Sequence, residues 1–164
     1  MIEIIPNWHP TFVHFTVALV SVSFIFHVLS YLTLLTQFRT GKLASELEIV
    51  AHWSLWLAAL FTVATVLAGF YAFYTVKHNE ISHYVMVIHR NLAITTATIL
   101  FLTACWSVWR YIQHQVLTVW FVLVLFILQG LVIVTGWYGG ELVYRYGTGV
   151  LSLPGEEKEI LHHH

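Results

Sequence analysis

The sequence predicts an all-α integral membrane protein built as an antiparallel four-helix bundle. Of its 164 residues, 59% are hydrophobic and only 9% are charged, whereas about 25% are charged in an ordinary soluble domain. Four long segments are also almost free of Asp, Glu, Lys and Arg. Such segments cross lipid as helices, and none of them shows the alternating pattern of barrel strands. No basic stripe is present, so we expect no nucleic-acid partner, only the lipid bilayer and protein or small-molecule partners.

We expect transmembrane helices at about residues 11–36, 46–76, 81–110 and 116–139, within a single domain over residues 1–150. The first helix contains a charge-free run of 25 residues, Thr11 to Leu35. At 1.5 Å per residue this run can cross about 30 Å of hydrocarbon. Residues 151–164 are expected to form a polar tail that ends in the remnant of a purification tag.

Four crossings place both termini and the connection near residue 80 at one end of the bundle, which we call the terminal end. The connections near residues 40 and 115 lie at the other, which we call the loop end. No Lys or Arg precedes the first helix, whereas Arg39 and Lys42 follow it. The positive-inside rule therefore predicts that the termini lie outside the cytoplasm.

Four histidines within these segments carry the functional hypothesis, because an ionisable group inside the bilayer costs about 2.5 kcal/mol or more when charged. By residue count, His14 and His89 share one depth near the terminal end. His27 and His52 share another, nearer the loop end, to within about 5 Å. Two imidazoles on facing helices can ligate one haem iron from its two sides. We therefore expect haem b between His14 and His89, and a second between His27 and His52.

Small and cationic neighbours support the first of these sites more than the second. Ala18 and Ala93 each follow a ligand candidate by four residues and lie on the same helical face. Arg90, beside His89, could pair with a haem propionate or could simply snorkel to the interface.

The alternatives stay open for individual histidines. His9 or His83 could replace a ligand at the terminal end, and otherwise they are solvated, as are His78 and His114. Thirteen residues turn a helix by about 220°, so His14 and His27 share no narrow stripe. They serve two sites only if they face different helices; otherwise His27 points at lipid or bonds to a carbonyl.

Two further residues have plain expectations. Cys105, the single cysteine, excludes an intrachain disulfide and a cysteine zinc site. We expect it to be a small buried side chain. Gln129, in the middle of the fourth segment, is expected to make an interhelical hydrogen bond and not a quinone contact.

Three stretches resemble a widespread bacterial family of small four-helix membrane proteins of unknown function. They are HPTFVHFTVAL near the start, HRNLA at the third segment and GWYGGELVYRYGTGV at the end. The resemblance runs from about Pro6 to Val150. It implies four spans in a bacterial inner (plasma) membrane, histidines at the positions of His14 and His89, and redox roles near respiratory proteins. Thr16 stands where the family pattern has proline, and His27 and His52 are not part of that pattern.

The function that these observations favour is a di-haem b-type cytochrome that transfers electrons between a quinone pool and/or a soluble cytochrome or cupredoxin. Electron transfer is favoured over catalysis of a net reaction, and an oligomer is compatible with the sequence. Two alternatives remain. The first is a non-haem protein that uses its histidines for proton or metal-ion passage. The second is a structural membrane anchor subunit.

Overall fold

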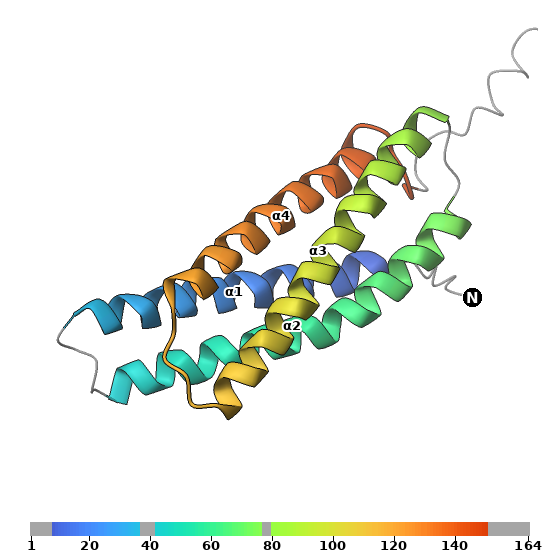
Figure 1. The fold of residues 1–164 in the computed structure, drawn as a ribbon. Coiled ribbons are helices and arrows are strands. Elements are labelled where there is room, and N and C mark those ends of the chain that lie inside the picture. The colour runs from blue at the N-terminus through green and yellow to red at the C-terminus, as the bar shows by residue number, and fades with distance from the viewer. Residues whose placement is uncertain (1–7, 37–41, 77–79, 151–164) are drawn as a thin grey trace, which may run out of the picture.

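The structure, a computed structural model, describes residues 8–36, 42–76 and 80–150. Within them it has four helices (Figure 1): α1 (His9–Leu35), α2 (Lys42–Thr75), α3 (Glu80–Ile112) and α4 (Val119–Tyr144). Each is long and apolar enough to cross a membrane. The predicted all-α membrane bundle is thereby confirmed. Arg39, His78 and residues 151–164 lie outside the described residues.

The helices form two antiparallel hairpins, α1/α2 and α3/α4 (Figure 1). The α1/α2 pair makes the most extensive contact, α2 also packs on α3, and α4 closes on α1. Both hairpins begin and end at the terminal end. Each helix therefore has two neighbouring helices, and side chains from all four can meet near the bundle axis.

The fourth helix is longer than predicted. We expected it to end at residue 139 because glycines follow, but α4 continues through Gly139 and Gly140 to Tyr144. A glycine costs a helix about 1 kcal/mol, less than leaving backbone groups unpaired in lipid. The chain turns only afterwards, at Gly147 and Gly149, whose φ values of 62° and 81° suit glycine.

The core of the bundle consists of large apolar side chains from three helices. Leu55, Leu100, Phe121, Leu125 and Leu128 are fully buried. Apolar side chains also cover the outside of every helix, as expected for surfaces in contact with lipid. The polar side chains instead gather on the inner faces, as with Ser23, His27 and Ser30 on α1 and Thr96, Thr103 and Ser107 on α3.

Two side chains test the remaining expectations about the fold. Gln129 Nε2 donates to Ser21 Oγ at 3.2 Å and so joins α4 to α1, as predicted. The prediction of a buried Cys105 was wrong, since this side chain is exposed on α3. Its small apolar character suits a lipid-facing position equally well.

Candidate functional site

Two histidines meet at the terminal end of the bundle. The ring of His9, in the first turn of α1, lies edge-on to the ring of His89 on α3, with centroids 6.2 Å apart and planes at 79°. We expected His14 to be the partner of His89, but His14 is exposed and bonds through Nδ1 to the carbonyl of Pro10. Five residues turn a helix by about 140°. When His9 points into the bundle, His14 therefore points away from it.

Each ring of this pair is held by the other helix of its own hairpin. His9 Nδ1 donates to the carbonyl of Thr65 on α2 at 3.0 Å. His89 Nδ1 donates to the carbonyl of Thr135 on α4, also at 3.0 Å. A carbonyl accepts only, so both bonds place the proton on Nδ1 and the lone pair on Nε2. This is the tautomer in which a histidine binds a metal through Nε2.

Two glycines provide the space for the two rings. A Cβ atom at Gly69 would lie 3.0 Å from His9 Cε1, and one at Gly139 would lie 3.2 Å from His89 Cε1. With a side chain at either position, the neighbouring ring would have to move by a few tenths of an ångström. Ala18 and Ala93 were predicted as the small neighbours of a haem macrocycle beside His14 and His89; Ala18 is exposed and Ala93 is half-buried.

The two hairpins use the same spacing to build this arrangement. Thr16 follows His9 by seven residues, as Thr96 follows His89, and each glycine follows its carbonyl-bearing threonine by four. The threonine hydroxyls also pair, Thr16 with Thr65 at 2.8 Å and Thr96 with Thr135 at 3.0 Å. The site is thus an internal repeat. Aligning the two halves of the sequence would have shown it, whereas counting depth along each helix does not.

The donor set suits a haem better than a bare metal ion. In the part of the chain that the structure describes, no group of three His, Cys, Asp or Glu side chains is placed to hold a metal ion. A haem needs only two axial ligands. With bonds of about 2 Å, two imidazoles on opposite sides of one iron have ring centres about 6 Å apart. The pair of His9 and His89 meets that requirement.

Arg90 lies directly after His89 in this region. Its guanidinium sits 4.9 Å from the centre of the Phe73 ring and donates to Asn91 Oδ1 at 3.2 and 3.3 Å. It has no carboxylate partner among the described residues. Its role toward a propionate stays a prediction.

His27 and His52 also meet, as their predicted common depth required. Their ring centroids are 5.2 Å apart near the loop end. His27 Nδ1 bonds to Ser23 at both its carbonyl (2.9 Å) and its hydroxyl (3.1 Å). His27 is buried, and its Nε2 has no hydrogen-bond partner among the described residues. His52 Nδ1 bonds to Ser107 Oγ at 2.8 Å.

This second pair does not fit a haem. Its centroid separation is shorter than the about 6 Å that two axial ligands of one iron require. Phe121 and Trp56 also pack on the two rings, with centroids at 5.2 Å from His27 and 5.7 Å from His52 respectively. The repeat of the terminal end is absent here, since the positions matching His27 and His52 in the other hairpin are Ser107 and Val122.

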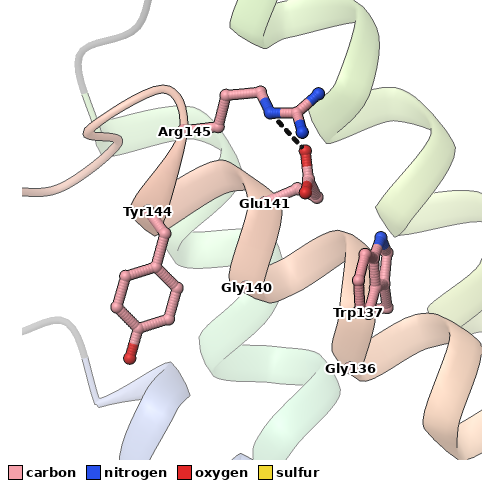
Figure 2. A pocket seen from close by; sticks show the side chains of 6 residues that line it. All are labelled: Gly136, Trp137, Gly140, Glu141, Tyr144 and Arg145. Atoms are coloured by element: carbon pink, nitrogen blue, oxygen red, sulfur yellow. Dashed lines mark ion pairs between the residues drawn. The ribbon is translucent and has the colours of Figure 1, made fainter.

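A separate hollow of about 640 Å³ lies on the outer face of α4 (Figure 2). Gly136 and Gly140 form its floor, Trp137 and Tyr144 flank it, and Arg145 Nε pairs with Glu141 Oε2 at 2.9 Å beside it. The histidine pairs take no part in it. It is a surface feature next to the terminal site and not a wall of that site.

Comparisons with known proteins are consistent with this architecture. Neither curated proteins nor solved structures show a match to the chain. A family model described as "Predicted membrane protein (DUF2231)" matches residues 6–152. The chain therefore belongs to the DUF2231 family of predicted membrane proteins.

Proposed function

We propose that the protein is a membrane-embedded b-type cytochrome in which His9 and His89 would hold one haem. The observation that carries the proposal is the pair of rings 6.2 Å apart, each bonded through Nδ1 to a backbone carbonyl. The haem would lie near the terminal end, where a soluble cytochrome or cupredoxin, or a quinone, could exchange electrons with it. The pair of His9 and His89 replaces the pair of His14 and His89 that the sequence predicted.

The chain's own residues would set the properties of the cofactor. A bound haem supplies one-electron chemistry at its iron. The carbonyls of Thr65 and Thr135 fix the orientation of each ring and increase the electron density on the ligating nitrogen. Arg90 would neutralise a propionate.

The alternatives explain less of the site. Metal-ion passage requires clusters of several ligands, and the described residues hold no such group of three. A purely structural anchor does not require two histidines with matched carbonyl partners, each packed against a glycine whose nearest neighbours are atoms of that ring. Proton passage would leave the terminal repeat unexplained.

An absorption spectrum of the protein, purified from cells supplied with a haem precursor, tests the proposal. We expect a Soret band and, after reduction, a sharp α band. His9→Ala and His89→Ala should each lose the bound pigment, because one axial ligand is removed. His14→Ala is the matched control and should keep it, since His14 is exposed.

The opposite pattern would overturn the assignment. A colourless wild-type protein would end the cytochrome proposal, and loss of pigment in His14→Ala with retention in His9→Ala would restore the original pairing. Elution of each variant as a single species from a size-exclusion column shows that the loss is not due to misfolding.

A further inference from the structure

A cavity of about 680 Å³ lies at the loop end, between α1, the first turns of α2 and the end of α3. Its volume falls in the range of about 300–1,000 Å³ that is typical of small-molecule sites. His52 lines it, while His27 lies behind His52 and further inside the bundle. Neither histidine of the terminal site contributes to it. The cavity is therefore a second and separate candidate site.

The cavity offers a carboxylate and an imidazole on one helix. Glu48 and His52 both line it and lie one turn apart on α2. His52 Nε2 is 3.7 Å from Glu48 Oε1, which is longer than a hydrogen bond. Glu48 and His52 can therefore each form a hydrogen bond with a ligand atom that lies between or beside them.

A donor faces them from α3. The Arg110 side chain is buried, with its guanidinium 5.5 Å from the centre of the Phe121 ring. It donates to Thr118 Oγ1 and to the carbonyl of Val116. A guanidinium has five N–H groups, so these two bonds leave others for a ligand.

The charges indicate what kind of molecule fits. Lys42 also lines the cavity, but its charge is balanced by Glu46, which lies 3.5 Å away and outside the cavity. Of the remaining charges, Glu48 would repel an anion and Arg110 would repel a simple cation. A neutral hydroxyl group, which both donates and accepts, can satisfy a carboxylate and a guanidinium together. The ligand is therefore expected to be uncharged and to carry a hydroxyl group.

The remaining walls favour an aromatic ring. Leu34, Ile49, Tyr111 and Leu117 add apolar surface to the cavity. The Tyr111 ring lies 5.5 Å from that of His52, centre to centre. Aromatic rings gain from offset or edge-on contacts at such distances. Because the cavity sits where a bundle of lipid-spanning helices ends, a ligand with an apolar tail could place that tail in the bilayer.

His27 lies behind His52 and adds a buried hydrogen-bond acceptor next to the cavity. Its Nε2 has no hydrogen-bond partner among the described residues, and the residue is only 1% exposed. An unsatisfied buried acceptor costs about 1–3 kcal/mol. Glu48, His52 and His27 thus form a row of ionisable groups that leads from the cavity into the bundle, as suits a ligand with an acidic hydroxyl.

We propose that this cavity binds the head group of a lipid-soluble quinol, with one ring hydroxyl bonded by Glu48 or His52 and by Arg110. The proposal concerns binding only and does not depend on the haem. Glu48 supplies an acceptor that the oxidised quinone, which has no hydroxyl, cannot use. The site should therefore prefer the quinol to its quinone.

Anaerobic equilibrium dialysis of a short-chain benzoquinol against the full-length protein in micelles tests this. We expect saturable binding of one quinol per chain, weakened about tenfold in Glu48→Gln by loss of a bond to a charged group. Glu46→Gln is the matched control. It makes the same chemical change on the same helix, but Glu46 pairs with Lys42 at 3.5 Å and does not line the cavity. The control should bind as the wild type does.

Three results would overturn the proposal: partition no greater than into empty micelles, equal loss in Glu46→Gln and Glu48→Gln, or equal affinity for quinol and quinone. The Glu48 side chain is half-exposed, so its variant should fold, and circular dichroism checks that it does. His89→Ala should lose the haem and keep quinol binding, which separates failure of this proposal from failure of the cytochrome assignment.

Discussion

At the scale of single residues, the direction in which a histidine points decides its role more than its depth does. His14 lies about 7.5 Å further along α1 than His9 and is exposed, while His9 meets His89. On α1 the polar residues His9, Thr16, Ser23, His27 and Ser30 recur every seven, four or three residues, and none of them is exposed. This stripe marks the inner face of the helix, and His14 lies off it. Residue counts along the helix selected His14, whereas the spacing of the polar residues would have selected His9.

Replacement of Gly139 by alanine should damage the terminal site. The new Cβ would lie 3.2 Å from His89 Cε1 and 3.6 Å from Nδ1, and the displaced ring would lose its bond to the Thr135 carbonyl. We expect weaker retention of haem, measured as pigment left after size-exclusion chromatography. Gly69→Ala, at the equivalent position, should act the same way.

Gly136→Ala is the control for this pair of variants. A Cβ there meets no atom within 4 Å, so the change should leave the pigment intact and add up to about 1 kcal/mol of helix stability. Equal pigment loss in Gly136→Ala and Gly139→Ala would show that the glycines act through the backbone and not through the ring contact.

At the scale of the helices, a single hydroxyl pair ties the two helices of each hairpin together next to the histidine. Thr65→Val should break the bond to Thr16, and Thr135→Val the bond to Thr96, while both keep the shape of the side chain. Interhelical bonds of this kind contribute about 0.6 kcal/mol in membrane proteins. Thr65 also donates to the carbonyl of Phe61, and Thr96 to that of Leu92, so Thr65→Val removes the acceptor of its pair and Thr135→Val removes the donor. We expect each variant to lose free energy of unfolding, measured by titration with a denaturing detergent.

The matched control is Thr98→Val. Thr98 is exposed and its hydroxyl bonds only to the carbonyl of Ile94 in its own helix, at 2.9 Å. This variant should unfold at the same detergent fraction as the wild type. A loss in Thr98→Val as large as in Thr65→Val would mean that valine lowers stability through helix propensity alone.

The helices themselves were predictable, because charge-free length is a strong signal and lipid permits little else. The end of α4 was not. Five glycines between residues 136 and 149 indicated a turn region, yet the helix includes Gly136, Gly139 and Gly140. At Gly139 the missing side chain leaves room for the His89 ring, and the chain does not turn there. Only the contacts between helices distinguish a glycine that makes room for a ring from one that permits a turn.

At the scale of the whole molecule, the two ends of the bundle differ in symmetry. At the terminal end the hairpins repeat one another, so His9 and His89 are equivalent partners with equivalent carbonyls. At the loop end, His27 and His52 both come from the α1/α2 hairpin, and Ser107 of α3 bonds to His52. A symmetric pair suits a cofactor ligated from two sides, and an asymmetric cavity suits a ligand with a distinct head group.

Because the two ends carry different sites, the orientation of the protein in the membrane decides which site faces the cytoplasm and which faces the outside. With Arg39 and Lys42 after the first helix and no Lys or Arg before it, we expect the loop end in the cytoplasm and the terminal end outside. In a Cys105→Ala background, Val150→Cys should react with a membrane-impermeant maleimide on intact cells. Ser45→Cys, exposed at the loop end, should react only after permeabilisation. The reverse labelling would place the histidine pair of His9 and His89 on the cytoplasmic side.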